Sequence, residues 1–127
     1  MGQYLLDNNA ISNYFSGLLT AKGMTFMAEV FDQTPTISVI TEIEALSWMN
    51  PDKSKEQIVK AFVQDASVLP LGSAVVTECV KIRRSRKIKT PDAIIAATAI
   101  VHELTLITSD NDFKNINGLK IIDPHSL

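Results

Sequence analysis

Short apolar runs alternate with longer amphipathic stretches along this chain. The runs lie at residues 4–6, 36–40, 67–71, 104–108 and 119–122, and several are rich in β-branched side chains. Such runs are typical of buried strands. Strands that alternate with helices are joined by right-handed crossovers. The pattern therefore predicts an α/β fold with a central, mainly parallel sheet flanked by helices.

The stretches between these runs place apolar residues at helical spacing. We expect helices from Asn8 to about residue 31, from Thr41 to about residue 49, after Pro51 and from Ser73. Thr41 followed by Glu44 matches a capping box, in which both side chains bind the first turn of a helix. The last helix, residues 92–102, is apolar almost all round, which predicts that it is buried.

Composition describes an ordinary globular protein and excludes little. The chain has 127 residues, 46% of them hydrophobic and 20% charged, and a net charge of −2. We expect one domain over residues 1–127, in the cytoplasm, without a membrane segment. Cys79 is the single cysteine and fits a small core residue in a reducing compartment.

Acidic residues stand where strands should end or helices should begin. They are Asp7, Glu44, Asp92 and Asp110. The carboxyl ends of parallel strands and the adjacent helix N-termini converge on one crevice, so these four carboxylates should gather there. Because they repel one another, a hard divalent cation with oxygen ligands, Mg²⁺ or Mn²⁺, would stabilise the arrangement. The chemistry that such an ion most readily supports is hydrolysis at phosphorus.

Each acid also has an ordinary structural explanation. Asp7 could simply end a strand, and Glu44 could act only in the capping box, with Glu42 as an alternative ligand. Asp92 in a first helical turn would interact with the helix dipole by roughly 0.3–1 kcal/mol. Asp110 and Asp112 are common turn residues. The argument for a site is their joint arrival at one edge of the predicted sheet.

A basic run precedes the last predicted helix. Residues 81–89 hold six cationic side chains, including Arg83, Arg84, Arg86, Lys87 and Lys89. Cations at a helix C-terminus are favourable in themselves, so a solvated helix end is one reading. The run leads directly to Asp92, however, and would bring positive charge to the rim of the acidic crevice. There it could hold a polyanion such as RNA.

Four blocks of the sequence resemble the signature blocks of PIN-domain ribonucleases, and among these the small VapC-type toxins of bacterial type II toxin–antitoxin pairs. The blocks are Leu-Leu-Asp-Asn-Asn-Ala-Ile at 5–11, Ile-Ser-Val-Ile-Thr-Glu-Ile-Glu-Ala-Leu at 37–46, Thr-Pro-Asp-Ala-Ile-Ile-Ala-Ala-Thr-Ala at 90–99 and Leu-Ile-Thr-Ser-Asp-Asn-Asp-Phe at 106–113. They occur in the family's order and spacing over nearly the whole chain.

The resemblance implies a single PIN-like domain that is a Mg²⁺-dependent endoribonuclease, with Mn²⁺ able to substitute. It assigns the metal-binding and catalytic roles to Asp7, Glu44, Asp92 and Asp110. Supporting roles fall to Asn9, Thr108 and Asp112, with Glu42 as the alternative to Glu44. Asn8 replaces the Thr or Ser that is common between the first Asp and Asn of the family. The resemblance also implies an RNA substrate, a cognate antitoxin protein and a homodimer. The dimer and the antitoxin would use exposed apolar residues of the helix that begins at Thr41 and of the next helix.

Two other functions remain open at this point. One is a catalytically inactive PIN-like module that binds RNA. The other is a receiver-type phospho-acceptor domain, which has a similar length and acidic residues at strand ends. A receiver would need an acidic pair after its first strand, where this chain has Asp7-Asn8-Asn9.

Overall fold

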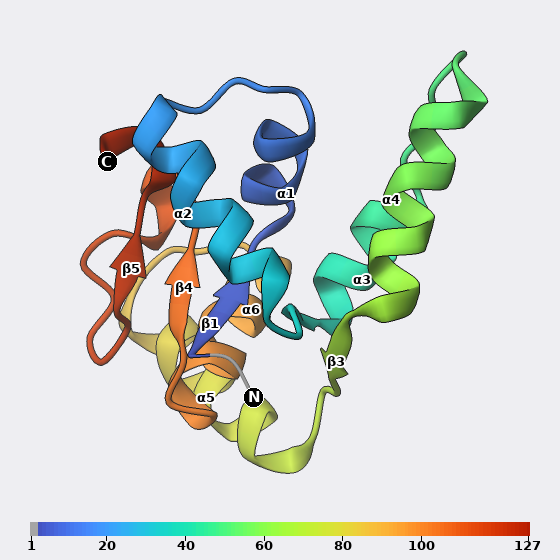
Figure 1. The fold of residues 1–127 in the computed structure, drawn as a ribbon. Helices are drawn as coiled ribbons and strands as arrows, with labels where there is room; N and C mark the ends of the chain where they lie inside the picture. Colours follow the sequence, from blue (N-terminus) through green and yellow to red (C-terminus); the bar gives the residue numbers. More distant parts are fainter. Residues whose placement is uncertain (1–2) are drawn as a thin grey trace.

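The computed structural model describes residues 3–127 and contains a five-stranded sheet in the order β3-β2-β1-β4-β5. All neighbouring strands are parallel (Figure 1). The strands are β1 (Tyr4–Leu6), β2 (Thr36–Ser38), β3 (Ser67–Leu69), β4 (Thr105–Ile107) and β5 (Ile121–Ile122). The α/β fold with a parallel sheet is therefore confirmed.

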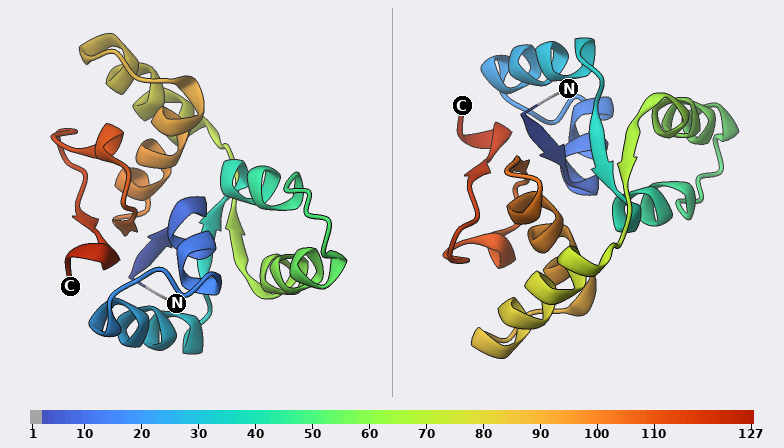
Figure 2. Two further views of the ribbon diagram at one scale, coloured as in Figure 1. Left: turned by 90° about the horizontal axis from the view of Figure 1, so that it is seen from above. Right: turned by 90° about the horizontal axis from the view of Figure 1, so that it is seen from below.

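Helices cover both faces of the sheet. They are α1 (Asn8–Phe15), α2 (Ala21–Asp32), α3 (Val39–Leu46), α4 (Lys53–Asp65), α5 (Ser73–Ser85) and α6 (Thr90–Val101), with 3₁₀ turns η1 (Asn111–Phe113) and η2 (Pro124–Ser126). Successive side chains of a strand point to opposite faces. Leu5 and Leu106 accordingly pack with α5 and α6, whereas Leu6 and Ile107 pack with α1 and α2. Figure 2 shows these two layers on either side of β1.

The first helical stretch is two helices, so the prediction of one helix from Asn8 to about residue 31 is wrong. The backbone of Gly17 adopts a left-handed conformation, with φ of +68°. Such a glycine commonly ends a helix, and α1 ends at Phe15. The hydroxyl of Thr20 then accepts a hydrogen bond of 3.0 Å from the amide of Gly23 and begins α2.

The helix after β2 begins earlier than predicted. We expected a strand to residue 40 and a capping box at Thr41, but the strand ends at Ser38. The hydroxyl of Ser38 accepts a hydrogen bond of 3.1 Å from the amide of Thr41, so Ser38 is the N-cap of α3. Glu44 therefore lies beyond the first turn, and the capping role predicted for it is wrong.

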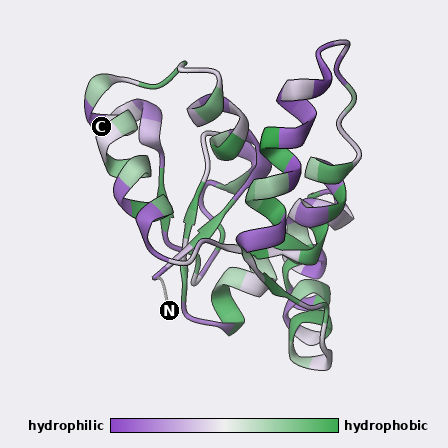
Figure 3. Ribbon diagram, turned by 45° about the vertical axis from the view of Figure 1, so that its right-hand side comes forward, coloured by the Kyte–Doolittle hydropathy of each residue, from purple (hydrophilic) through white to green (hydrophobic). Residues whose placement is uncertain are grey.

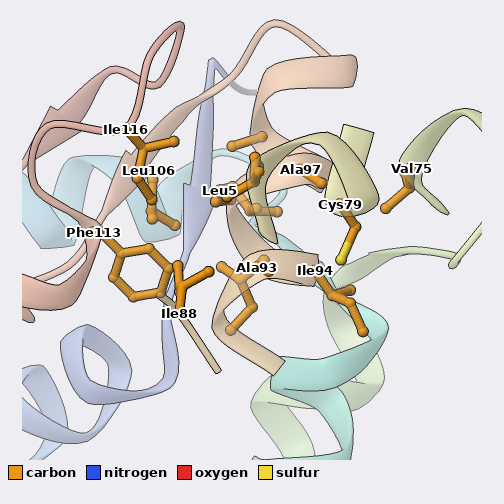
Figure 4. Close-up of a cluster of buried hydrophobic side chains, with 14 of the residues drawn as sticks. Leu5, Val75, Cys79, Ile88, Ala93, Ile94, Ala97, Leu106, Phe113 and Ile116 are labelled. Carbon is orange, nitrogen blue, oxygen red and sulfur yellow. The ribbon is translucent and has the colours of Figure 1, made fainter. Parts of the chain in front are cut away.

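The buried helix predicted near the C-terminal end is confirmed. All residues of α6 from Ala93 to Ala99 are buried. They form a core with α5 and with side chains from β1, β4 and the segment after β4 (Figure 4). Cys79 belongs to this core, as its apolar setting predicted.

The α3–α4 pair lies at the β2–β3 side of the molecule, where the two helices contact each other. Apolar and polar positions alternate along α4 (Figure 3). Exposed apolar side chains remain on both helices, among them Ile43, Leu46 and Ile58. Within residues 3–127, none of the helices has the length and hydropathy needed to cross a bilayer.

Gly23 provides a test of the close approach between α2 and η2. A Cβ atom at this position would lie 2.2 Å from the backbone oxygen of Pro124. Because a backbone atom cannot move away alone, we expect Gly23→Ala to lower the free energy of unfolding by about 1–3 kcal/mol. Thr25→Ala, at an exposed position of the same helix, should change it by less than about 0.5 kcal/mol. Urea denaturation measures both, and equal stability of Gly23→Ala and wild type would contradict the packing described.

Candidate functional site

The strand order reverses between β1 and β4, which are adjacent although not consecutive in sequence. Ligands bind at such a switch point in open parallel sheets, outside the carboxyl ends of the strands. Asp7 follows β1, and its amide donates a hydrogen bond of 3.0 Å to the carbonyl of Ile107 at the end of β4. Thr108 follows β4 directly. The residues that end these two central strands thus lie side by side at the switch point.

Asp7 is a buried carboxylate held by two hydrogen bonds. The residue is 6% exposed. Its Oδ1 accepts from the amide of Asn8 at 2.8 Å, and its Oδ2 accepts from the hydroxyl of Thr108 at 2.8 Å. Burial raises the pKa of Asp7 to about 6 against the lowering effect of these bonds, and the charges of Glu44 and Asp92 raise it further. Each carboxylate oxygen retains a lone pair for another ligand.

The hydroxyl of Thr108 connects the segments that follow β1 and β4. It donates to Asp7, and it accepts from the amide of Asp110 at 3.1 Å and from Nδ2 of Asn9 at 3.4 Å. The Oδ1 of Asn9 in turn accepts from the amide of Ser109 at 3.3 Å. A hydroxyl has one donor and two acceptor sites, so Thr108 uses all of them. Asn9 and Thr108 thus lie where they can orient Asp7 and the start of the Asp110 segment.

Three further carboxylates meet beside Asp7. Asp92 lies in the first turn of α6, Asp110 caps η1, and Asp112 lies within η1. One carboxylate oxygen from each lies within 4.8 Å of the other two. Burial, followed by the charges of Asp110 and Asp112, raises the pKa of Asp92. The structure therefore brings together acids from two distant segments.

Glu44 extends the same acidic cluster. Partial burial and the charge of Asp92 raise the pKa of Glu44, and the charge of Glu44 raises the pKa of Asp7. Glu42 lies two residues earlier on α3 and hence points roughly 200° away around the helix. Of the two glutamates, Glu44 is the one whose charge acts on the cluster.

The donors gathered at this edge are carboxylate oxygens, which suit Mg²⁺ or Mn²⁺ rather than zinc or copper. The Asp92, Asp110 and Asp112 oxygens, which all lie within 4.8 Å of one another, are close enough to share one such cation. His102 caps the opposite end of α6, and Cys79 is buried in the core. The residues present thus fit a hard divalent cation.

The basic run spans the end of α5 and its connection to α6. Arg84, Lys87 and Lys89 are exposed. The Nε of Arg83 donates to the carbonyl of Ile88 at 3.3 Å, and Nη1 of Arg86 donates to the carbonyl of Lys114 at 2.9 Å. Two of the five predicted RNA-binding side chains therefore also contact the protein backbone.

A groove of about 420 Å³ beside the site is a feature that the sequence did not indicate. Its walls come from α1, α3 and α4 and include Asn8, Phe15, Trp48, Lys55 and Ile58. An aromatic cluster behind it joins three helices, because Phe15 and Phe31 both lie within 6.0 Å of the Phe62 ring, measured between centroids. Helical spacing identified the apolar faces of these helices but not which helices face one another.

Known structures share this architecture. The chain is 29% identical to a protein in a toxin–antitoxin complex from Klebsiella pneumoniae, with a TM-score of 0.75 over 95% of this chain and 97% of that chain. FitAcB from Neisseria gonorrhoeae is 22% identical, with a TM-score of 0.78 over 98% of this chain and 99% of that chain. A chain of VapBC-1 from nontypeable Haemophilus influenzae is 23% identical, with a TM-score of 0.72 over 95% of this chain and 97% of that chain. The sequence matched no curated protein.

The fold and the site define a parallel α/β domain with a carboxylate crevice at its switch point. The chain belongs to the PIN domain family, whose sequence profile matches residues 4–119. The predicted PIN resemblance is confirmed. The receiver alternative is wrong, because a receiver-type doubly wound sheet has the strand order 2-1-3-4-5.

The raised pKa of Asp7 predicts a pH-dependent stability of the metal-free protein. The pKa of Asp7 is about 6 in the folded state and 3.8 in the unfolded state. Its contribution to the free energy of unfolding is therefore complete below pH 3.8 and is lost as the pH rises through 6. We expect the stability of wild type relative to Asp7→Asn to fall by about 3 kcal/mol over this window. Urea denaturation in the presence of a metal chelator, repeated over this pH range, measures the free energy of unfolding of both proteins. Parallel stability curves for the two proteins would contradict the buried carboxylate.

Proposed function

We propose that this PIN domain is a metal-dependent endoribonuclease and the toxin of a VapBC-like toxin–antitoxin pair, acting in the cytoplasm. The observation that supports the proposal most is the crevice in which Asp7, Glu44, Asp92 and Asp110 interact through their charges. A purely structural role for any one acid does not explain why four meet at the switch point. Family membership adds independent support.

In the proposed reaction, Asp7, Glu44, Asp92 and Asp110 hold Mg²⁺ or Mn²⁺, and Asp112 supports them. When bound, the cation lowers the pKa of a water molecule and neutralises the charge that develops on the scissile phosphate. The bonds from Asn8 and Thr108 keep the Asp7 carboxylate in one orientation. Burial of Asp7 reduces screening by water and so strengthens its interaction with a cation.

The proposed substrate is RNA, bound through its phosphates by the exposed cations Arg84, Lys87 and Lys89. Arg84 lies at the end of α5, and Lys87 and Lys89 lie on the connection to α6, where the charge of Lys89 acts on Asp92. Positive charge there offsets the repulsion between the carboxylates and a polyanion. Arg83 lies in the same basic run and also donates a hydrogen bond to the carbonyl of Ile88. We include it in the proposed RNA-binding surface.

The proposed partner is an antitoxin segment that docks in the groove between α1, α3 and α4. The groove is lined by apolar and aromatic side chains such as Phe15, Trp48 and Ile58, with Lys55 at its wall. An amphipathic helix with an acidic residue would complement both features. The 29% identical protein in a toxin–antitoxin complex supports an antitoxin as the partner.

We also propose the homodimer that the family resemblance implies. Apolar side chains remain exposed on α3 and α5, and they lie outside the groove: Ile43, Leu46, Val76 and Val80. A second copy of the chain would remove these side chains from water, which is favourable by roughly 25 cal/mol per Å² of apolar surface.

The variant Asp92→Asn distinguishes between two roles of Asp92, that of a metal ligand and that of a residue that only complements the helix dipole. Loss of one charge from a repulsive cluster should leave the metal-free variant as stable as wild type or slightly more so. At a free Mn²⁺ concentration of about 100 times Kd, wild type should gain about 2.7 kcal/mol of stability, and the variant clearly less. Cleavage of structured RNA in Mn²⁺ should be lost. Thermal melting with and without Mn²⁺, together with a cleavage assay, measures these effects.

Glu29→Gln is the matched control, because Glu29 is an exposed acid on α2. It should retain both the Mn²⁺-dependent stabilisation and cleavage. A folded Asp92→Asn protein that cuts RNA as well as wild type would refute the proposed active site.

Ile58→Glu tests the groove. We expect a charge at this position, which the partner would cover, to weaken binding of the proposed cognate antitoxin by about 2 kcal/mol or more. Lys60→Glu, at an exposed position on the same helix, should bind nearly as wild type does. Calorimetric titration measures both affinities, and undiminished binding by Ile58→Glu would place the partner elsewhere.

A further inference from the structure

One side chain attaches the α5–α6 connection to the acidic segment after β4. Arg86 is the C-cap residue of α5 and precedes Asp92 by six positions. Its Nη1 donates a hydrogen bond of 2.9 Å to the carbonyl of Lys114, which directly follows η1. The bond therefore joins the two segments that supply the Asp92, Asp110 and Asp112 carboxylates.

The Arg86 side chain is only partly presented to solvent, and its bond to Lys114 lies at the surface. It is half-buried, whereas Arg84, Lys87 and Lys89 are exposed. Its Nε atom is buried and has no hydrogen-bond partner among residues 3–127. Ile88 and Phe113 belong to one buried cluster and bring the same two segments together (Figure 4).

The η1 segment is held by the buried Phe113 side chain and by local hydrogen bonds, among them one of 2.9 Å from the amide of Asp112 to Oδ1 of Asp110. It is a single 3₁₀ turn with hydrogen bonds from Phe113 to Asp110 at 3.3 Å and from Lys114 to Asn111 at 3.0 Å. Asn115 follows with φ of +63°, a conformation that ends the turn. Fixing such a segment costs roughly 1–2 kcal/mol of backbone entropy per residue, so an attachment at its end affects how well it is ordered.

We propose that Arg86 is a positioning residue, which holds the Asp110–Asp112 segment at its distance from Asp92, and that it is not a phosphate ligand. This inference rests on the metal site of the proposed function. It differs from the role that the basic run suggests for all its members. Lys89, by contrast, acts on the site by charge, since it lowers the pKa of Asp92 against the stronger effects that raise it.

The experiment compares Arg86→Ala with Arg84→Ala, which removes the same charge two residues away. Arg86→Ala should bind Mn²⁺ about tenfold more weakly by calorimetric titration, as expected when a residue that orients metal ligands is lost. The salt dependence of its RNA binding should stay as in wild type. Arg84→Ala should bind Mn²⁺ normally and reduce the salt slope by about 0.7, the value for one lost contact to a single strand. Wild-type Mn²⁺ affinity in Arg86→Ala, or a salt slope reduced as in Arg84→Ala, would overturn the proposal.

Hydrogen exchange of the metal-free proteins tests the effect of the Arg86–Lys114 bond without depending on metal binding. In Arg86→Ala, faster exchange should be confined to the amides of Asp112, Phe113 and Lys114. Unchanged exchange, or acceleration throughout the protein, would overturn the positioning role. If wild type bound no Mn²⁺, the proposed function would fail while this measurement still decided the role of Arg86. Should Arg86→Ala not fold, Arg86→Lys retains the charge and most of the apolar stem but not the planar fork, and it undergoes the same measurements.

Discussion

The parallel pairing of β1 with β4 determines where the functional side chains can meet. Its register pairs Leu5 with Leu106 and Leu6 with Ile107, and this brings Asp7 next to Thr108 at the strand ends. In this register Leu5 and Leu106 face one core layer, and Leu6 and Ile107 face the other. The packing that builds the two core layers thus also sets the contact between Asp7 and Thr108. The remaining acids are arranged around that contact.

The acidic cluster opposes folding, and the surrounding elements prevent it from relaxing. Burial and like charges raise the pKa of Asp7 and Asp92, which means that their charged forms are unfavourable in the metal-free fold. Asp92 cannot move away, because residues Ala93–Ala99 behind it are buried in the core. Asp110 and Asp112 lie on a short 3₁₀ turn instead of a long helix. The site therefore combines carboxylates on rigid elements with carboxylates whose order depends on a few local bonds.

The sequence predicted those features that depend on strong local patterns. Strand positions, the buried α6 and the gathering of acids at the carboxyl edge follow from apolar runs and from the geometry of parallel sheets. The break at Gly17 was missed because apolar residues continue at helical spacing on both sides of it. The start of α3 was misplaced because Ser38-x-x-Thr41 and Thr41-x-x-Glu44 are both plausible caps, and the structure uses the first. The groove and the Arg86–Lys114 bond depend on contacts between segments distant in sequence, which no local pattern encodes.

The groove and the acidic crevice lie along one short helix. Asp7 caps α1, the next residue, Asn8, lines the groove, and Phe15 lines it at the other end of the helix. An eight-residue helix is only about 12 Å long. A partner seated in the groove would thus lie within a nucleotide or two of the carboxylates and would compete with substrate for space. Inhibition by such a partner would be steric, and it would need no conformational signal between separate sites.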